Sequence, residues 1–339
     1  MYIDDIDERD LELLHALQIA PRVGWSDAGR ILGANRATLA ERWHRLRSAG
    51  LAWVTAHPGG SYRSVTLALV EVDCLPGARA RVVEAVCGDP RVVTVEESTR
   101  GRDMLLTVIT ADLAGMTAFL LDDLETLEGV ARERSYIATA VHRHGTHWRL
   151  NALTPAQQSA FERLAGPRRP TDRIAPPRDA WPLMEALAYD GRASAADLAR
   201  ATGRNPSTVR RQLDRLLRSD LVSFRCELAA EVSGWSVSST WRARVEPADH
   251  DRTIAALATL PELRMCVSTT GDTNIAMSMW THSVHDMRRI EGLFSHHLPW
   301  LRLRDSAVNL RTPKRMGWLL DSSGRATGRV IPSTALCRW

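Results

Sequence analysis

Two short stretches of the sequence combine arginines with small polar residues in a pattern that suits contact with a polyanion. The stretch from Asn35 to Arg47 holds four arginines and one glutamate, and the stretch from Asn205 to Arg218 holds four arginines and one aspartate. Each stretch has a net charge of +3, in a chain whose total is only +4. Guanidinium groups bind phosphates and guanine edges through paired N–H donors, so nucleic acid is the ligand that this pattern favours. The alternative is a solvated basic helix face.

The residues around each basic stretch predict a helix-turn-helix. A first helix is expected from Asp7 to Leu17, a second from Asp27 to Leu32 with Ser26 as N-cap, and a third from Asn35 to about Ser48. The later stretch is clearer, because Ser194 precedes Ala195–Thr202, Gly203 ends that helix, and Asn205-Pro206 is typical of a helix start. Two short helices joined by a turn that contains glycine are typical of this motif.

The third helix of such a motif enters the major groove with its N-terminal end, where side chains reach base edges while neighbouring arginines hold phosphates. Double-stranded DNA is therefore the expected partner. The candidate DNA-contacting residues are Asn35, Arg36, Thr38, Arg42, Arg45, Asn205, Ser207, Thr208, Arg210, Arg211 and Arg215.

The two stretches belong to a long internal repeat. Leu13, Arg22, Asn35 and Thr38 are each matched by the same residue type 170 positions later, without a gap. The same offset aligns Thr99 and Gly101 with Thr269 and Gly271, and Trp148 with Trp318. Solenoid repeats are about 20–50 residues long, so this offset indicates a duplicated multi-domain unit.

The second part of each unit alternates strand and helix patterns in the order βαββαβ, which is a ferredoxin-like layout. The expected elements of the first copy are 65–72, 78–87, 92–96, 104–109, 116–127 and 130–141. Those of the second copy are 235–245, 250–260, 265–268, 274–280, 284–298 and 301–310.

These patterns predict an α+β fold of two repeats, each a winged-helix-like helix-turn-helix domain followed by a ferredoxin-like domain. The expected boundaries are 4–60 and 178–230 for the helix-turn-helix domains, 61–150 and 231–320 for the ferredoxin-like domains. A proline-rich linker is expected over 151–177, with a short helix at 155–165, and a flexible tail over 321–339.

The order of these elements resembles that of the Lrp/AsnC family of bacterial transcriptional regulators. The resemblance is carried by Asp7 to Leu51, by Gly191 to Gly203, and by the segment from Thr99 to Leu106, which is similar to the family's Gly-x-x-Asp turn. It implies a ferredoxin-like module that oligomerises and binds a small-molecule effector, often an amino acid, near that turn. The effector-binding residues implied are Gly101, Arg102, Asp103, Met104, Gly271, Asp272, Thr273 and Asn274. The turn departs from the family pattern because Met104 and Asn274 occupy the Asp position, and the glycines have the alternative role of allowing a tight turn.

Two alternatives stay open. Sirohaem decarboxylases resemble the same two-part unit and act on a tetrapyrrole, but neither predicted third strand holds their Asn-x-Trp-Phe segment. His142, His144 and His147 lie within six residues, as do the adjacent His296 and His297 elsewhere, and could bind a metal or end a strand in solvent.

Composition narrows the function classes. No apolar run reaches the roughly 18 residues of a membrane span, the acidic N-terminus lacks a signal-peptide pattern, and the five cysteines have no metal-binding spacing. Lys314 is the only lysine against 43 arginines, which a GC-rich genome explains. We expect a cytoplasmic homo-oligomer that binds DNA, without a membrane partner or a cofactor, and not an enzyme.

Overall fold

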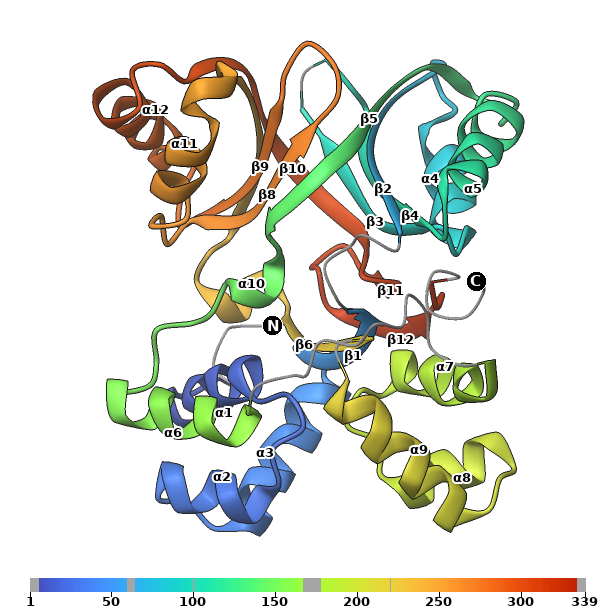
Figure 1. The fold of residues 1–339 in the computed structure, drawn as a ribbon, viewed down its shortest axis with the longest axis vertical. Helices are drawn as coiled ribbons and strands as arrows, with labels where there is room; N and C mark the ends of the chain where they lie inside the picture. The colour runs from blue at the N-terminus through green and yellow to red at the C-terminus, as the bar shows by residue number, and fades with distance from the viewer. Residues whose placement is uncertain (1–5, 60–64, 100, 167–177, 220, 334–339) are drawn as a thin grey trace. The chain divides into compact units, whose positions relative to one another are not determined.

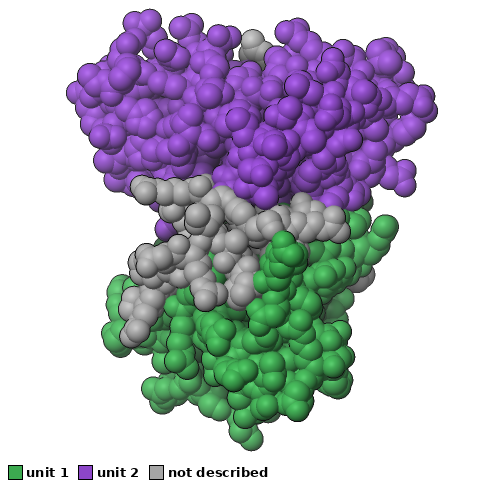
Figure 2. All heavy atoms as spheres, turned by 45° about the vertical axis from the view of Figure 1, so that its right-hand side comes forward, with its two compact units in different colours: residues 1–64, 149–232, 316–339 green, residues 65–148, 233–315 purple. Residues whose placement is uncertain are grey.

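The computed structural model describes residues 6–59, 65–99, 101–166, 178–219 and 221–333. The chain divides into two compact units, shown in Figure 2. Unit 1 comprises residues 1–64, 149–232 and 316–339, and unit 2 comprises residues 65–148 and 233–315. Each unit therefore combines corresponding segments from both halves of the sequence.

Unit 1 contains two helix-turn-helix motifs, each followed by a strand (Figure 1). The first consists of α1 (Glu8–Ile19), α2 (Trp25–Leu32), α3 (Arg36–Ser48) and β1 (Ala52–Pro58). The second consists of α7 (Trp181–Tyr189), α8 (Ala195–Thr202), α9 (Pro206–Arg218) and β6 (Val222–Leu228). The remaining elements of unit 1 are α6 (Pro155–Ala165), η3 (Arg178–Ala180), α10 (Ala230–Ser233), β11 (Trp318–Leu320) and β12 (Ala326–Val330).

The helix caps explain most of these boundaries. Asn35 and Asn205 accept backbone N–H bonds at the starts of α3 and α9, and Gly33 and Gly203 end α2 and α8 with φ of 66° and 65°. Ser26 is not the cap that the sequence predicted, because α2 starts one turn earlier, after Gly24, and has no side-chain cap.

The two motifs are joined by an antiparallel pair of strands, β1 and β6. Thr55 pairs with Arg225, its equivalent in the 170-residue repeat, and the flanking pairs run outward to Ala52 with Leu228. Pairing of equivalent residues in opposite directions places a local two-fold axis at the centre of the ribbon.

Two equivalent arginines reinforce this joint from both sides. Arg22 donates to the carbonyls of Gly191 and Ala193, and Arg192 donates to those of Pro21 and Val23. The Arg192 guanidinium also lies 4.0 Å above the Trp25 ring. These reciprocal contacts hold the two motifs in one fixed relation.

Unit 2 contains two βαββαβ arrangements. The first is β2 (Thr66–Cys74), α4 (Arg79–Gly88), β3 (Val92–Ser98), β4 (Met104–Thr110), α5 (Leu113–Thr117) with η1 (Ala118–Leu124), and β5 (Val130–Arg143), followed by η2 (Gly145–His147). The second is β7 (Val237–Arg244), η4 (Pro247–Asp249) with α11 (His250–Leu257), β8 (Leu263–Thr269), β9 (Ile275–Thr281), α12 (Asp286–His297) and β10 (Arg302–Arg315).

The eight strands of unit 2 close into a ring. Their order is β10-β3-β4-β2-β5-β8-β9-β7, and β7 pairs again with β10. The last strand of each half thus pairs with the second strand of the other half, at β5–β8 and β10–β3. Helices α4 and α5 lie on the outside of one half and α11 and α12 on the outside of the other (Figure 1). Closure removes the free sheet edges and leaves an interior lined by both halves.

The register within unit 2 corrects the repeat offset. Glu71 faces Leu105 and Arg134 on neighbouring strands, and Arg242 faces Ala276 and Asp305 in the same way. The structural equivalents are therefore 171 positions apart here, so the sequence alignment of Thr99 with Thr269 is one residue out of register. Trp148 and Trp318 are not equivalent either, because Trp148 follows η2 in unit 2 and Trp318 lies in β11 of unit 1.

The predicted linker and tail also need correction. Residues 155–165 form α6 as predicted, capped by Thr154 and packed on α1 and α2. In the predicted tail, Ala326–Val330 forms β12, which pairs with β11 and places Val330 in a cluster with Trp53 and Trp318. Serine, glycine and arginine composition alone did not reveal this strand.

The structure carries no candidate membrane span among its described residues, because none of its helices there is both long and apolar enough. Cys74, Cys87, Cys226 and Cys266 are free thiols, and burial raises the pKa of each. Cys337 lies outside the described residues.

Candidate nucleic-acid interface and ligand cavity

Helix α9 presents a continuous basic face. Its inner side is buried through Val209, Gln212, Leu213 and Leu216, which leaves the opposite side to solvent. Arg210, Arg211, Arg215 and Arg218 are all exposed there, and together with Ser207 and Asp214 they line a shallow groove along the helix. None of these four arginines forms an ion pair with an acid among the residues that the structure describes.

The N-terminal end of α9 is also exposed. Asn205 accepts a hydrogen bond of 2.9 Å from the Ser207 backbone N–H and one of 2.7 Å from the Ser207 hydroxyl. The Asn205 oxygen therefore holds the helix start, while its amide N–H groups face outward. Ser207 is exposed and Thr208 half-buried, so the polar groups predicted to reach base edges surround the entry to this helix.

Helix α3 has the same charge but a different arrangement. Arg42 donates hydrogen bonds of 2.7 Å to Asp7 and 2.9 Å to Asp10, and Arg45 also binds Asp10, whose side chain is fully buried. The bonds to Asp7 and then to Asp10 raise the pKa of the Arg42 guanidinium. Arg47 forms an ion pair of 2.6 Å with Asp190. Three of the four arginines of α3 therefore bind acids of unit 1.

The rest of the predicted set on α3 is open to solvent. Asn35 caps the helix by accepting a 2.8 Å bond from the Ala37 N–H, and Arg36 and Thr38 are exposed. The structure thus brings all eleven candidate DNA-contacting residues to two third helices, with a free arginine cluster on α9 and an engaged one on α3.

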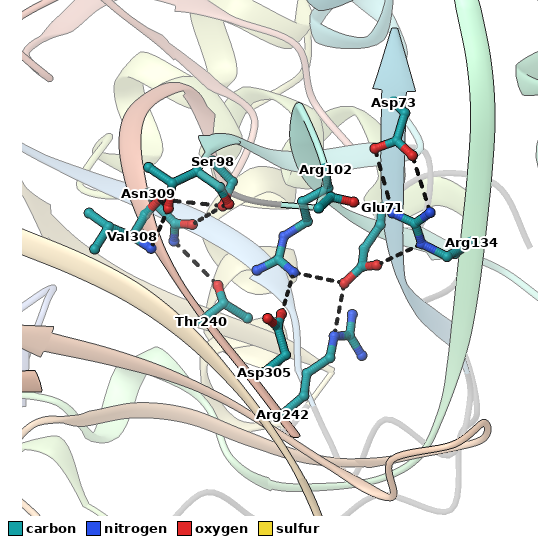
Figure 3. A network of polar contacts seen from close by, with 12 residues as sticks. Glu71, Asp73, Ser98, Arg102, Arg134, Thr240, Arg242, Asp305, Val308 and Asn309 are labelled. Carbon is teal, nitrogen blue, oxygen red and sulfur yellow. Dashed lines mark hydrogen bonds and ion pairs between the residues drawn. The ribbon is translucent and has the colours of Figure 1, made fainter. Parts of the chain in front are cut away.

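Unit 2 encloses a polar cavity of about 250 Å³ (Figure 3). Its wall comes from both halves of the ring, namely from Glu71, Gly101, Arg102, Arg134, Tyr136, Arg242, Asp272, Thr273 and Asp305.

Glu71 is the centre of the charge network at this cavity. Its carboxylate accepts hydrogen bonds of 2.9 Å from Arg102 Nη1, 3.0 Å from Arg242 Nε and 3.1 Å from Arg134 Nε. Arg102 also binds Asp305 at 3.0 Å, and Arg134 binds Asp73 at 3.1 Å (Figure 3). The side chains of Arg102 and Arg242 are only 2% and 3% exposed. Their charges are therefore held by hydrogen bonds and opposite charges, as burial requires.

A second polar cluster lies close to this network. Asn309 on β10 donates to Glu96 at 2.9 Å and to Ser238 at 3.1 Å, and Ser98 donates to Asn309 at 3.3 Å. Burial raises the pKa of Glu96, and the charge of Arg315 partly opposes that shift.

Four of the eight predicted effector-binding residues line the cavity: Gly101, Arg102, Asp272 and Thr273. The other four do not. Asp103 accepts a 2.7 Å bond from the Cys74 N–H, Met104 is fully buried, and Asn274 bonds the backbone of Val245. Gly271 has φ of 105° and Gly101 φ of 70°, as the turn interpretation of the two glycines requires.

Glu71, Arg134, Tyr136, Arg242 and Asp305 were missed in the sequence. The available signal was a charged residue within an apolar β-branched strand, as Glu71 is within residues 65–72. What could not be read was the partner, because Arg242 lies in the equivalent strand of the other half of the chain.

The histidines form pairs. His142 Nε2 and His250 Nε2 lie 2.7 and 2.8 Å from the Ser268 hydroxyl, and burial, followed by the charge of His250, lowers the pKa of His142. Among the described residues, no group of three or more His, Cys, Asp or Glu side chains is placed to hold a metal ion.

Comparisons with known proteins agree with this architecture. Residues 67–147 match the Lrp/AsnC ligand binding domain, and residues 183–223 match a winged helix-turn-helix DNA-binding domain. The chain is built from domains of the Lrp/AsnC family. It is 29% identical over 149 residues to the HTH-type transcriptional regulator FL11 of Pyrococcus furiosus, a match that covers 42% of this chain and 94% of the relative. It is 28% identical over 143 residues to the Bkd operon transcriptional regulator of Pseudomonas aeruginosa, covering 40% of this chain and 91% of the relative.

One match covers the whole fold. The crystal structure of the siroheme decarboxylase NirDL covers 98% of this chain and 97% of its own, with a TM-score of 0.58 at 12% sequence identity. Its complex with an iron-uroporphyrin III analogue matches with a TM-score of 0.59. This corrects the expectation that the chain is not an enzyme, because the fold that matches along its whole length is that of an enzyme. At 12% identity, the likeness shows the fold alone.

Proposed function

We propose that this chain is a sequence-specific DNA-binding transcriptional regulator of the Lrp/AsnC type, formed by the fusion of two units. The observation that carries the proposal is the exposed, unpaired arginine cluster on α9, which follows a capped helix-turn-helix. Arginines in this position would hold phosphates beside the groove, and the polar groups at Asn205, Ser207 and Thr208 would read base edges. The relatives named as transcriptional regulators support this function.

In this proposal the two third helices do not contribute equally. The ribbon of β1 and β6 and the reciprocal contacts of Arg22 and Arg192 present α3 and α9 as a two-fold related pair. Two-fold related reading helices suit a pair of half-sites. Because the arginines of α3 bind acids within unit 1, the half-site under α9 would carry more of the affinity.

The ferredoxin-like halves of unit 2 would sense a small-molecule effector at the cavity around Glu71, and further association into homo-oligomers would follow from the family resemblance. A regulator that reads chromosomal DNA would work in the cytoplasm. The fused chain would form internally an arrangement that its shorter relatives, which align with about 40% of it, would need two chains to build.

The test is an electrophoretic mobility shift with the full chain and DNA from upstream of its own gene. We expect a discrete complex that Arg211→Ala weakens and that rising salt dissociates, because bound arginines release counterions. A chain that binds no genomic fragment at low salt would refute the proposal.

The fold likeness over 98% of the chain supports a second candidate, an enzyme that acts on a tetrapyrrole. The cavity around Glu71 does not favour it, since 250 Å³ is below the roughly 300–1,000 Å³ of pockets for drug-sized ligands, and a tetrapyrrole is larger. Titrating the protein with an iron-uroporphyrin III analogue distinguishes the two, because tetrapyrrole binding would shift the Soret absorption band.

A further inference from the structure

The two buried arginines of unit 2 leave part of their hydrogen-bonding capacity unused. Arg102 engages Glu71 and Asp305 through Nη1, and its Nε and Nη2 have no partner. Arg242 engages Glu71 through Nε, and its Nη1 and Nη2 have no partner. Buried polar groups in folded proteins are almost always satisfied, so four orphan donors at one cavity require an explanation.

The unused donors form two complete edges. The Nε and Nη2 groups of Arg102 point along one side of its guanidinium plane, and the Nη1 and Nη2 groups of Arg242 form the end of its plane. Each edge offers two parallel N–H bonds, the geometry that a planar pair of oxygens accepts. Tyr136 fixes the plane of Arg242, because the guanidinium lies 3.7 Å from the centre of its ring.

The surrounding charges leave room for an anion. At the buried base of the cavity, Arg102 and Arg242 carry two positive charges and Glu71 carries one negative charge. Asp305, Arg134 and Asp272 stand at more exposed positions, with Asp305 30% and Arg134 26% exposed. Burial lowers the pKa of Arg242, in the direction expected for a guanidinium whose charge is incompletely compensated.

The cavity volume sets the size of the occupant. At about 250 Å³, it lies below the usual range for drug-sized ligands, so it admits a molecule of a few carbon atoms. The two edges come from different halves of the ring, Arg102 from the turn before β4 and Arg242 from β7. An occupant with two oxygen-bearing groups would contact both halves at once.

We infer that this cavity binds a small organic acid, with a carboxylate on one of the two arginine edges and a second oxygen acceptor on the other. The inference specifies the effector class of the proposed regulator, and it stands on unit 2 alone, whether or not unit 1 binds DNA. Such a ligand would supply acceptors for the orphan donors and one negative charge for the unbalanced arginine. Closing the contacts between the two halves would stabilise the ring, since a ligand that binds only the folded state raises its stability.

The experiment is calorimetric titration of the full chain with acetate, pyruvate, malonate and succinate, with sulfate and phosphate as inorganic anions. We expect a single site for pyruvate, malonate or succinate that binds at least about tenfold more tightly than acetate, because acetate fills one edge only. Absence of binding by all three two-acceptor acids, or binding of phosphate or sulfate alone, would overturn the inference.

Variants locate the site. Arg242→Lys keeps the charge but removes the paired edge, and we expect it to weaken binding at least about tenfold. Arg311→Lys is the matched control, since Arg311 pairs with Glu97 outside the cavity and should bind the acid as the parent does. Circular dichroism of each variant establishes that it is folded, and Arg102→Lys provides a second test should Arg242→Lys unfold. Undiminished affinity in a folded Arg242→Lys or Arg102→Lys protein would overturn the assignment.

A mobility-shift assay on the same protein separates this inference from the proposed function. Acid binding without any DNA binding would leave the cavity assignment intact and refute the regulator. DNA binding without acid binding would do the reverse.

Discussion

Helices α3 and α9 occupy equivalent places in two copies of one motif and carry the same net charge, yet their arginines do different work. On α9 the four arginines are exposed and unpaired, whereas on α3 Arg42 and Arg45 bind Asp7 and Asp10 of α1. The difference originates in the first helix of each motif, because the position equivalent to Asp10 holds Ala180 in the second copy. A charge count along a helix therefore states how many arginines are present, while the neighbouring helix decides how many are available to a ligand.

The comparison is most strongly tested by removing the arginines themselves. In Arg42→Ala/Arg45→Ala, Asp10 would remain fully buried without its cationic partners, and breaking a buried pair costs about 3–5 kcal/mol. The matched change Arg211→Ala/Arg215→Ala removes exposed, unpaired side chains and should cost within about 0.5 kcal/mol. Urea denaturation followed by tryptophan fluorescence measures both. Equal losses in the two variants would show that the arginines of α3 are not structural.

Acid should weaken the first motif more than the second. His15 accepts hydrogen bonds from the N–H groups of Ala152 and Leu153, and burial, with a smaller contribution from Arg149, lowers its pKa from 6.5 to about 4. Above pH 6.5, His15 is neutral in both folded and unfolded states, so stability is complete. Below it, the unfolded state takes up a proton first, and stability should fall by about 1.4 kcal/mol per pH unit until about pH 4, roughly 3 kcal/mol in all.

The control for this prediction is His15→Gln, which keeps an acceptor and does not titrate. The equivalent position in the second motif is the exposed Glu185, which has no such role. The variant should therefore lose most of the decline in stability between pH 6.5 and 4. An unchanged decline would assign the acid sensitivity to other groups.

DNA affinity should depend on α9 more than on α3. Removing an arginine that contacts a base edge costs about 1–3 kcal/mol, so Arg211→Ala should weaken binding between about fivefold and 150-fold. Arg42→Ala removes a side chain that is engaged with Asp7 and Asp10 and should leave affinity nearly unchanged once the protein is folded. Fluorescence anisotropy with one labelled DNA fragment compares them. Comparable losses would make the two helices equal readers.

The smallest expected effect is one that the two motifs share. Arg30 pairs with Asp27 on α2, and Arg200 pairs with Asp197 on α8, in both cases on well-exposed side chains one turn apart. Exposed pairs contribute about 0–1 kcal/mol, so Arg30→Ala and Arg200→Ala should each change the free energy of unfolding by less than that, and by similar amounts. A large effect in one copy only would reveal a further asymmetry between the motifs.

Local features could be predicted from the sequence, and long-range partners could not. Asn35, Asn205, Ser194 and Gly203 mark helix ends because capping depends on residues a few positions away. The helix at 155–165 and the βαββαβ order follow from periodicity in the same way. The ion pair of Arg42 with Asp10 depends on how α1 packs against α3, and that of Arg242 with Glu71 on closure of the ring, neither of which leaves a periodic signal.

The shift of the repeat from 170 to 171 residues shows the same limit at the cavity. Direct alignment at 170 sets Glu71 against Trp241, whereas the strand register sets it against Arg242. A one-residue slip moves a strand's side chains to the opposite face, so the charged pair at the centre of the cavity was hidden in the sequence alignment. The turn residues Arg102 and Asp272 were found because the family resemblance pointed to their loop, and Glu71 and Arg242 were not.

The most direct test of the central claim, that α9 carries the available DNA-binding charge and α3 does not, is the salt dependence of DNA binding. The logarithm of the affinity falls with the logarithm of salt concentration by about 0.9 per phosphate contact. Measured by anisotropy on one DNA fragment, Arg211→Ala or Arg215→Ala should reduce this slope by about one, and Arg42→Ala should leave it unchanged. A slope that falls in Arg42→Ala and stays constant in both α9 variants would contradict the account.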